Sequence, residues 1–484
     1  MSLPGGSRGG GGTPPAIGMP SGFGGAGDFG RAPGRGDKGL SLPLAETFRR
    51  AWEDPDLKAR ILFVLAMFAV FTLGTHIPVP IRGHTSQEIY DKLKTLQFFQ
   101  YLDAFGGGAL RRVSILALGL QPYITASIII QVLTTAFPQW KKELQEGGEY
   151  ARKQQNKRTR GLAVGLCFAQ GFATLGQMGP AIPDLTIFDK GLIILFWTAG
   201  AMFMLWLGEQ ISEKGIGNGT SLMIFAGIVL SLPNQFGTLF QQFQEGNVKF
   251  YSLLIIAAIF LVATWFIVYF TIAQRRIPIQ HMRRQVGTKV VGGATSYLPL
   301  SVNMAGVMPI IFASTFLFLP SQFATFFGGE RQPIGRFLNE VGKYLYPLND
   351  ERVFAALPLT KGFVGSILYL VLIFAFTYFW TAIQYNVEDI SQNLKRGGSF
   401  IPGIRPGKQT KDFLDGVISR ITVVGAGFIA CVALLQYVAP VLAFLPRGFQ
   451  LSALGGTSLL IMVSVALETM RQIEANLLMK QYGQ

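Results

Sequence analysis

Charged side chains are scarce in this 484-residue chain, in which Asp, Glu, Lys and Arg make up 14% of the residues. Soluble proteins average about 25%. Half of the chain is hydrophobic, and its mean hydropathy is +0.38. A set of soluble domains, which the length alone would allow, could not cover its surface with so few charges. The composition therefore indicates a protein that lies in a lipid bilayer.

Cysteine and histidine are rarer still, with two and three copies. Cys167 and Cys431 lie far apart in apolar stretches, which excludes a disulfide scaffold and favours ordinary core packing. His76, His84 and His281 fall at the ends of apolar runs or between them, where a solvated side chain is commoner than a ligand. Because P-loop, zinc-ligand and nucleophile-elbow patterns are also missing, we expect no cofactor, no metal site and no enzymatic activity.

What the chain has instead is a series of apolar runs, each roughly 17–25 residues long and about one bilayer thick. They predict ten membrane-spanning helices near residues 61–79, 113–137, 161–179, 191–208, 221–240, 252–272, 303–320, 362–385, 417–437 and 455–469. An even number of spans places both termini on the same side of the membrane. The Gly- and Pro-rich residues 1–40 cannot bury enough apolar surface to offset their ordering entropy, so we expect a disordered tail there.

The basic residues are unevenly distributed between the two faces that these spans define. Most of the 42 lysines and arginines fall in the N-terminal segment, the C-terminal tail and the connections between spans 2–3, 4–5, 6–7 and 8–9. The connection between spans 6 and 7 carries Arg275, Arg276, Arg283, Arg284 and Lys289 and no acidic residue. By the positive-inside rule, both termini and these connections are cytosolic.

The interiors of the predicted spans lack ionisable side chains, and Arg420 and Glu468 lie close to span ends. An ion-coupled secondary transporter built from inverted repeats, the main alternative class, needs ionisable or ion-coordinating groups at mid-span. A membrane enzyme, the second alternative, needs a catalytic group there. The residues therefore favour a passive membrane protein over both classes.

The second predicted span is interrupted by Gly119 and Pro122. Its unbroken part, 124–137, would be about 21 Å long, which is too short for a hydrocarbon core of about 30 Å. Either the span is an ordinary proline-kinked helix after a glycine-rich outer loop, or it begins at mid-membrane. In the second case residues 105–112 must fold back into the membrane, where irregular backbone survives only inside protein or beside a water-filled cavity. The local residues leave both alternatives open.

The connection between spans 8 and 9 contains the run Phe400-Ile-Pro-Gly-Ile-Arg-Pro-Gly407, in which two Pro-Gly turns flank Ile404 and Arg405. Paired turns stiffen a loop tip and would present Arg405 outward, in a position that suits a phosphate or a carboxylate. The alternative is a generic basic loop next to the membrane.

Several long motifs make the chain similar to the SecY family of protein-conducting channels, from about Phe48 to Tyr482. They are Gly119-Leu-Gln-Pro-Tyr-Ile-Thr-Ala-Ser-Ile-Ile-Ile-Gln131, Trp206-Leu-Gly-Glu-Gln-Ile-Ser-Glu-Lys-Gly-Ile-Gly-Asn-Gly219, Gln274-Arg-Arg-Ile-Pro278, Leu298-Pro-Leu-Ser-Val-Asn-Met-Ala-Gly-Val-Met-Pro309, the loop with two Pro-Gly turns, and Gly455-Gly-Thr-Ser-Leu-Leu-Ile461. Their number and order make a chance match very improbable.

The resemblance implies an all-α membrane protein with ten transmembrane helices in two inverted five-helix halves, 41–241 and 242–484, around a central pore. It implies a passive, gated channel that moves unfolded polypeptides across the cytoplasmic (inner) membrane and releases membrane segments laterally into it. The segment before the second span is a re-entrant plug in that family. Carried over, the plug covers about 101–114, with its centre at Phe105, Gly106, Gly107, Gly108, Ala109 and Leu110. The short second span already places this stretch in the membrane, so the plug becomes the favoured alternative.

The resemblance also implies a ring of aliphatic side chains that narrows the pore at mid-membrane. The positions that match this pore ring are Leu120, Ile124, Ile224, Ile311 and Ile461. An apolar constriction resists wetting by ions, while branched side chains can part around a passing chain. Thr220 stands where some relatives have isoleucine, which makes the ring slightly more polar.

A lateral gate between spans 2–3 and 7–8, through which signal sequences reach the lipid, is implied as well. The matching gate positions are Thr125, Gln170 and Leu319. Arg275, Arg276 and Arg405, in the cytosolic loops 273–301 and 386–415, match arginines that dock the ribosome or the SecA motor, and guanidinium groups suit RNA phosphates and acidic proteins alike. The implied partners are the SecE and SecG small subunits, SecA, the ribosome, signal peptides, nascent chains and membrane lipids.

Overall fold

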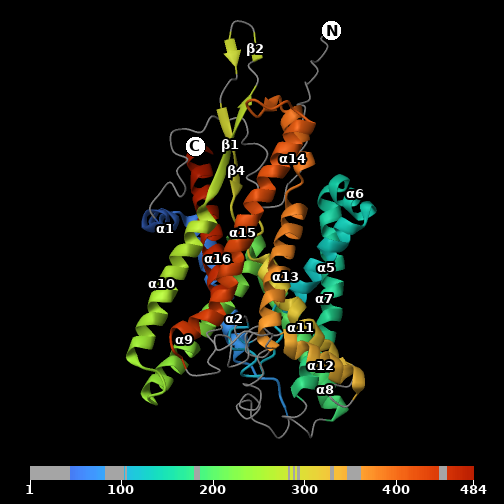
Figure 1. Cartoon of the computed structure of the whole chain (residues 1–484), viewed down its shortest axis with the longest axis vertical. Helices are drawn as coiled ribbons and strands as arrows, with labels where there is room; N and C mark the ends of the chain where they lie inside the picture. The colour runs from blue at the N-terminus through green and yellow to red at the C-terminus, as the bar shows by residue number, and fades with distance from the viewer. Residues whose placement is uncertain are drawn as a thin grey trace, which may run out of the picture.

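Long helices account for most of the chain in the computed structural model, and Figure 1 shows them packed side by side with a narrow sheet projecting from one end. The structure describes residues 44–81, 103, 106–178, 186–281, 284–286, 289–291, 295–326, 332–345, 361–445 and 455–483. The predicted tail, 1–40, and His84 lie outside the described residues.

Ten described helices overlap the ten predicted spans. They are α2 (Pro55–Thr75), α5 (Gln121–Ala136), α7 (Gly148–Met178), α8 (Ile187–Lys214), α9 (Gly219–Gln244), α10 (Phe250–Ile272), α11 (Met308–Phe326), α13 (Lys361–Gln384), α15 (Lys408–Leu442) and α16 (Gly456–Gly483). Within the described part of the chain, six helices are long and apolar enough to cross a membrane: α2, α8, α9, α10, the α13 region and α15. The predicted class, a multi-spanning helical membrane protein, is confirmed.

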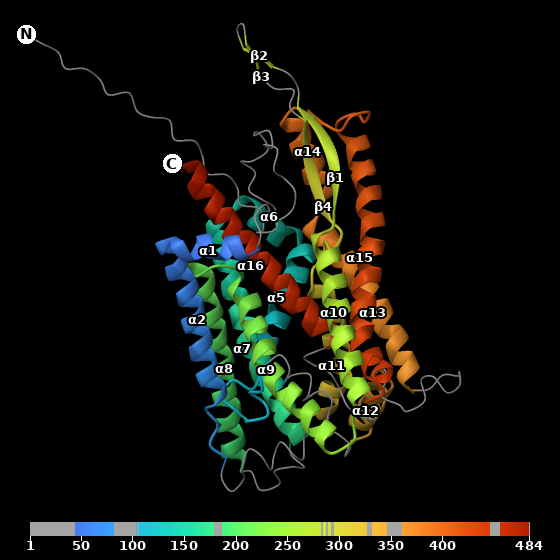
Figure 2. The ribbon, with the colours of Figure 1, turned by 90° about the vertical axis from the view of Figure 1, so that its left-hand side faces the viewer.

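Shorter helices lie at the two ends of this helical body: α1 (Leu44–Glu53), α6 (Pro138–Glu146), α12 (Pro333–Leu345) and α14 (Val387–Arg396). Figure 2 shows α1, α6, α14 and the C-terminal end of α16 near the end that carries the sheet, whereas α12 lies at the opposite end. The even number of spans predicts this arrangement of α1 and α16 at one end.

The start of α5 differs from that of the predicted second span, 113–137. The helix begins at Gln121, and its 16 residues span about 24 Å. Pro122 lies in its first turn, where the missing N–H of proline would have had no helical partner. Residues 106–120 are turns instead of helix. Of the two alternatives for this span, the structure has the one in which a short helix begins after an irregular segment.

The connection between α10 and α11 forms a sheet that the sequence patterns do not predict. Strand β1 (Gln274–His281) pairs antiparallel with β4 (Thr295–Ser301) and with β5 (Ser399–Phe400), in the order β4-β1-β5, and β2 (Arg284–Val286) pairs with β3 (Lys289–Val291). Along β1, Ile277 and Ile279 are buried while Arg276 and Pro278 are exposed, which is the two-residue period of a strand. Beneath the sheet, these isoleucines pack with residues of α14 and α15.

Candidate functional site

The five predicted pore-ring residues meet in one apolar cluster. Leu120 lies directly before α5, Ile124 on α5, Ile224 on α9, Ile311 on α11 and Ile461 on α16. Leu120, Ile124, Ile311 and Ile461 are all less than 9% exposed. Since α5 and α9 belong to the first predicted half and α11 and α16 to the second, the cluster lies where the two halves meet.

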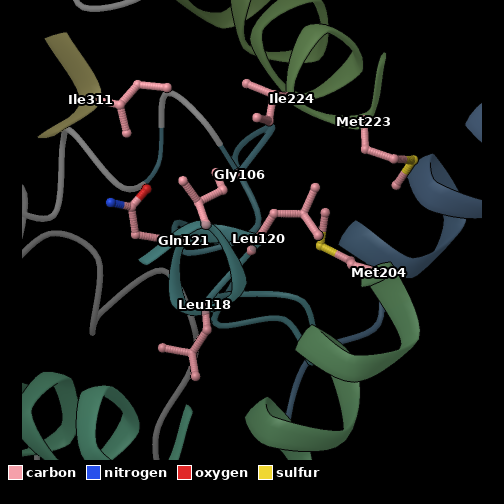
Figure 3. A pocket seen from close by; sticks show the side chains of 10 residues that line it. Gly106, Leu118, Leu120, Gln121, Met204, Met223, Ile224 and Ile311 are labelled. Carbon is pink, nitrogen blue, oxygen red and sulfur yellow. The ribbon is translucent and has the colours of Figure 1, made fainter. Parts of the chain in front are cut away.

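A pocket adjoins this cluster, and Figure 3 shows the side chains that line it. Four ring residues contribute to the lining, and the predicted plug residue Gly106 does too. Sequence reasoning did not select the other side chains that line it, which are Leu118, Gln121, Met204 and Met223. Figure 3 shows Met204 beside Leu120. Methionine is unbranched and adapts its shape, so these thioethers can follow changes in the shape of the pocket.

Residues 106–120, here called the pre-α5 segment, are largely buried against the end of α2. The Val79 N–H donates to the Val113 carbonyl at 2.9 Å, and the Ile115 N–H donates to the Ile77 carbonyl at 3.1 Å. The segment is therefore held by paired backbone bonds although it belongs to no helix, and these bonds satisfy its polar groups within the protein.

The predicted plug residues that the structure describes lie inside the protein. Gly106 to Leu110 are all buried, and Phe105 lies outside the described residues. Ala109 joins the apolar cluster that contains the pore ring. Leu110 joins a second cluster with Cys167 of α7 and Trp197 of α8. The pre-α5 segment thus connects the ring to the helices of the first half.

Glycines let the pre-α5 segment turn tightly and approach α9. Gly107 and Gly108 have φ of 69° and 78°, in the left-handed region that other residues rarely adopt. A Cβ on Gly107 would lie 3.4 Å from the Cα of Gly227 on α9, so a larger side chain would push the segment away from that helix.

Contacts between Asp103 and Arg111 bring the two ends of residues 103–111 together. The Asp103 carboxylate accepts the Arg111 backbone N–H at 2.9 Å, and its other oxygen lies 3.6 Å from Arg111 Nε. The Gly108 N–H donates to the Asp103 carbonyl at 3.1 Å. These contacts hold the two ends of the predicted plug together as a compact unit.

The predicted lateral gate falls where α7 packs against both α5 and α11. Gln121 Nε2 donates to Thr315 Oγ1 at 3.0 Å, which joins α5 of the first predicted half to α11 of the second. Such an interhelical bond contributes about 1 kcal/mol, so this polar link across the seam is easily broken.

The three predicted gate residues lie half-buried on the helices of this seam: Thr125 on α5, Gln170 on α7 and Leu319 on α11. The Thr125 hydroxyl donates to the Gln121 carbonyl at 3.0 Å and so turns back onto its own helix. Gln170 Nε2 is buried and has no hydrogen-bond partner among the residues that the structure describes.

The predicted docking arginines are exposed at the end of the molecule that carries the sheet. Arg275 and Arg276 lie at the start of β1, and Arg405 lies in the loop after β5. Because β5 pairs with β1 at Gln280, four residues beyond Arg276, that pairing lies roughly 13 Å farther along the strand. The two loops that carry the arginines therefore meet on one platform, and β5 runs antiparallel to β1, from His281 toward Arg276.

The loop of Arg405 is braced from within. Gly403 and Gly407 have φ of 81° and 104°, which only glycine adopts readily. The Ile404 N–H donates to the Ile401 carbonyl at 3.0 Å, and the Thr410 hydroxyl donates to the Arg405 carbonyl at 2.9 Å. These bonds fix the backbone at Arg405 while its side chain is exposed.

At the same end of the molecule, ion pairs tie α16 of the second predicted half to the start of α2 of the first. Lys480 of α16 lies 2.9 Å from a carboxylate oxygen of Asp54, the N-cap of α2, and 2.7 Å from one of Asp56. The hydrogen bond from Lys480 lowers the pKa of Asp54, and the bonds to Asp56 and Asp54 raise the pKa of Lys480. Both directions mean that the charged forms are favoured here.

Helices packed around an apolar cluster to which both predicted halves contribute, with a buried irregular segment beside it, define a class: the fold is that of a protein-conducting channel. A solved structure described as that of a protein conducting channel matches with a TM-score of 0.60 at 17% identity, over 87% of this chain and 92% of that chain. Sec61 from the canine ribosome-channel complex matches with a TM-score of 0.56 at 15% identity, with the same coverage.

The sequence comparisons then give the family. The SecY family model matches residues 114–470. The protein translocase subunit SecY of Halalkalibacterium halodurans is 38% identical over 440 residues, which cover 88% of this chain and 96% of the relative. That of Pseudomonas aeruginosa is 38% identical over 433 residues, which cover 88% and 92%. The chain belongs to the SecY family.

Proposed function

We propose that this chain is the pore-forming subunit of a protein translocase and acts as a passive, gated channel. It moves unfolded polypeptides across the cytoplasmic membrane of a bacterium and releases membrane segments sideways into the lipid. Its partners supply the driving force, and the chain itself makes and breaks no covalent bond. Residues 41–241 and 242–484 act as two halves that part to open the pore.

One observation carries this proposal: aliphatic side chains from both halves meet in a single constriction. Transferring a bare charge into an apolar medium costs on the order of tens of kcal/mol, so a closed apolar ring blocks ions without any charged barrier. A polypeptide can pass when the halves part, because packing contacts hold the ring together.

The plug, 101–114, seals the pore beneath the ring at rest. The burial of its described residues, its approach to α9 at Gly107 and its compact Asp103–Arg111 closure support this role. Thr220 lies on α9, as Ile224 does, and is half-buried. During transport the plug leaves as one unit held by its internal Asp103–Arg111 contacts, and its backbone bond from Val79 to Val113 breaks.

Signal sequences leave through the seam between α5–α7 and α11–α13. Separation there breaks the Gln121–Thr315 hydrogen bond and exposes Thr125, Gln170 and Leu319 to the incoming helix. The unpartnered Gln170 amide then has a polar group to bind, such as a backbone carbonyl at the end of a signal helix.

The partners act on the end that carries the sheet, which we place in the cytosol together with both termini. Most basic residues fall in segments on this side, as the positive-inside rule requires of a cytosolic face. Exposed arginines there suit the phosphates of ribosomal RNA or an acidic surface of the SecA motor. The resemblance adds SecE and SecG as small membrane subunits, and the canine Sec61 relative was solved in a ribosome-channel complex.

Reconstitution tests this function. The chain is purified with SecE and SecG, placed in lipid vesicles, and supplied with SecA, ATP and a secretory precursor. We expect precursor to become protease-protected only in vesicles that contain the chain. The SecY of Halalkalibacterium halodurans, treated identically, serves as the positive control. Protection by that relative and none by this chain would refute the proposal.

A further inference from the structure

A histidine joins the two cytosolic loops that carry the docking arginines. His281 is the last residue of β1. Its Nε2 lies 2.9 Å from Ser296 Oγ of β4, and its Nδ1 lies 2.8 Å from Ser399 Oγ of β5. A neutral imidazole has one donor and one acceptor nitrogen, and a serine hydroxyl can serve as either, so both hydrogen bonds form together.

We infer that His281 is a positioning residue that fixes the loop of Arg405 against the strand of Arg275 and Arg276. The inference rests on the docking role proposed above for these arginines. It goes beyond that role because it assigns their relative placement to one side chain that contacts no partner itself.

The backbone alone holds β5 weakly. This strand has only two residues, and it pairs with β1 at Gln280–Phe400 and His281–Ser399. Strands usually run to about five or six residues, so a two-residue pairing has few ladder bonds. Gly397 and Gly398 precede it, and Gly398 has a φ of 62°. A side-chain bond across this pairing is therefore a large share of what fixes β5.

Other side-chain hydrogen bonds of the Arg405 loop hold it to neighbouring helices and not to β1. The Ser391 hydroxyl donates to the Gly407 carbonyl at 2.9 Å, and Thr410 bonds to Arg405. These bonds anchor the loop to α14 and α15, not to β1. Ile401 packs with Ile277 and Ile279, but apolar contact is non-directional and tolerates sliding. His281 adds a directional side-chain bond between the loops to the two-residue backbone pairing.

A partner that contacts the arginines of both loops benefits from this bond, because the loops are already held together before it binds. Ordering a loop during association costs free energy, and this cost is absent when the loop is already ordered in the free protein. Loss of His281 should therefore weaken docking, while the loop keeps its own turns and a fully docked channel still transports at its normal maximal rate.

The test measures translocation into vesicles as a function of SecA concentration. We expect His281→Ala and Ser399→Ala each to raise the half-saturating SecA concentration about fivefold, the effect of one ordinary hydrogen bond, with an unchanged maximal rate. Ser296→Ala is the matched control, because it removes the bond within one loop and keeps the bond between loops. It should change the half-saturating concentration less than about twofold.

Replacing the His281–Ser399 hydrogen bond by a disulfide distinguishes a positioning role from a loss of folding stability. Facing residues of antiparallel strands lie about 4.5–5.5 Å apart at Cα, within the range of a disulfide. In a Cys431→Ser background, H281C/S399C should behave like His281→Ala when reduced and like the wild type when oxidised. The oxidised and reduced samples are the same molecules, so a folding defect cannot produce the difference.

Three outcomes besides an unchanged response of His281→Ala would overturn the inference. Ser296→Ala could weaken docking as much as Ser399→Ala, His281→Ala could lower only the maximal rate, or the oxidised cysteine pair could stay as weak as the reduced one. A wild-type chain that fails to respond to SecA would instead refute the proposed function, and this inference with it. A wild-type response that His281→Ala leaves unchanged refutes the inference alone.

Discussion

Replacing Arg405 with glutamate should lower the rate of polypeptide translocation roughly a hundredfold, the order expected when a charge that docks a partner becomes repulsive. The side chain is exposed at the tip of a braced loop, so the chain should still fold and enter the membrane. Glutamate faces the same phosphates or carboxylates that arginine binds, and it adds repulsion to the lost attraction. Translocation driven by SecA into reconstituted vesicles measures the effect.

Two further variants locate the effect of Arg405. Lys408→Glu makes the same charge change three residues away, at an exposed site at the start of α15, and should reduce the rate only modestly. Arg405→Lys keeps the charge but loses the two-pronged hydrogen bonding of a guanidinium, so an intermediate rate is expected. Equal translocation rates for Arg405→Glu and the wild type would contradict the docking role proposed for this loop.

Adding one methyl group at Gly200 should raise the resting ion leak about tenfold, because overpacking of this kind typically costs about 1–3 kcal/mol and here it falls on the closed state. Gly200 lies on α8, and a Cβ there would collide with the Ile115 carbonyl oxygen of the pre-α5 segment. The segment cannot simply retreat, since the Ile115 N–H is bonded to Ile77 on its other side. The plug should therefore lose its resting position.

The same helix offers a control. A Cβ on Gly191 meets no atom within 4 Å, so Gly191→Ala should leave the leak unchanged and favour the helix slightly. Release of a trapped ion from vesicles that contain the channel without SecA measures both variants. Deletion of 106–110 tests the seal without touching α8 and should also raise the leak. Equal leaks from Gly200→Ala, Gly191→Ala and the wild type, together with a tight deletion variant, would contradict the plug.

The helical body of this protein could be predicted because bilayer length and apolar composition are local properties. Every predicted span overlaps a helix, and the error at the second span has a simple physical cause. Hydropathy cannot distinguish an apolar helix from an apolar irregular segment such as 113–120. Pro122 resembles an interruption in the sequence, although proline is also common in the first turn of a helix.

The sheet and the seam could not be predicted from local pattern. Ser399 meets His281 across 118 residues of sequence, and Gln121 meets Thr315 across 194. The two buried isoleucines of β1 alternate over too short a stretch to indicate a strand by themselves. These contacts depend on how segments far apart in the chain pack against one another, and local patterns in a single sequence do not indicate that packing.

The pore ring, likewise, could not be predicted from local pattern. In a chain that is half hydrophobic, five aliphatic residues carry no local signal, and only the family resemblance selected them. Met204 and Met223, which line the pocket, were missed for the same reason. Both methionines lie near the ring only because α8 and α9 pack beside it, and this packing cannot be read from the sequence alone.

Cysteine cross-linking of a stalled polypeptide tests most directly whether chains pass through the pore ring. Ile224→Cys in a Cys431→Ser background is paired with a precursor that carries one cysteine and a folded domain that halts it in transit. We predict a disulfide between the thiol introduced at position 224 and the stalled chain only when SecA and ATP are present, and none from Leu261→Cys on the exposed side of α10. Protease-protected precursor that never cross-links to position 224, or that cross-links to position 261 equally well, would contradict passage through the ring.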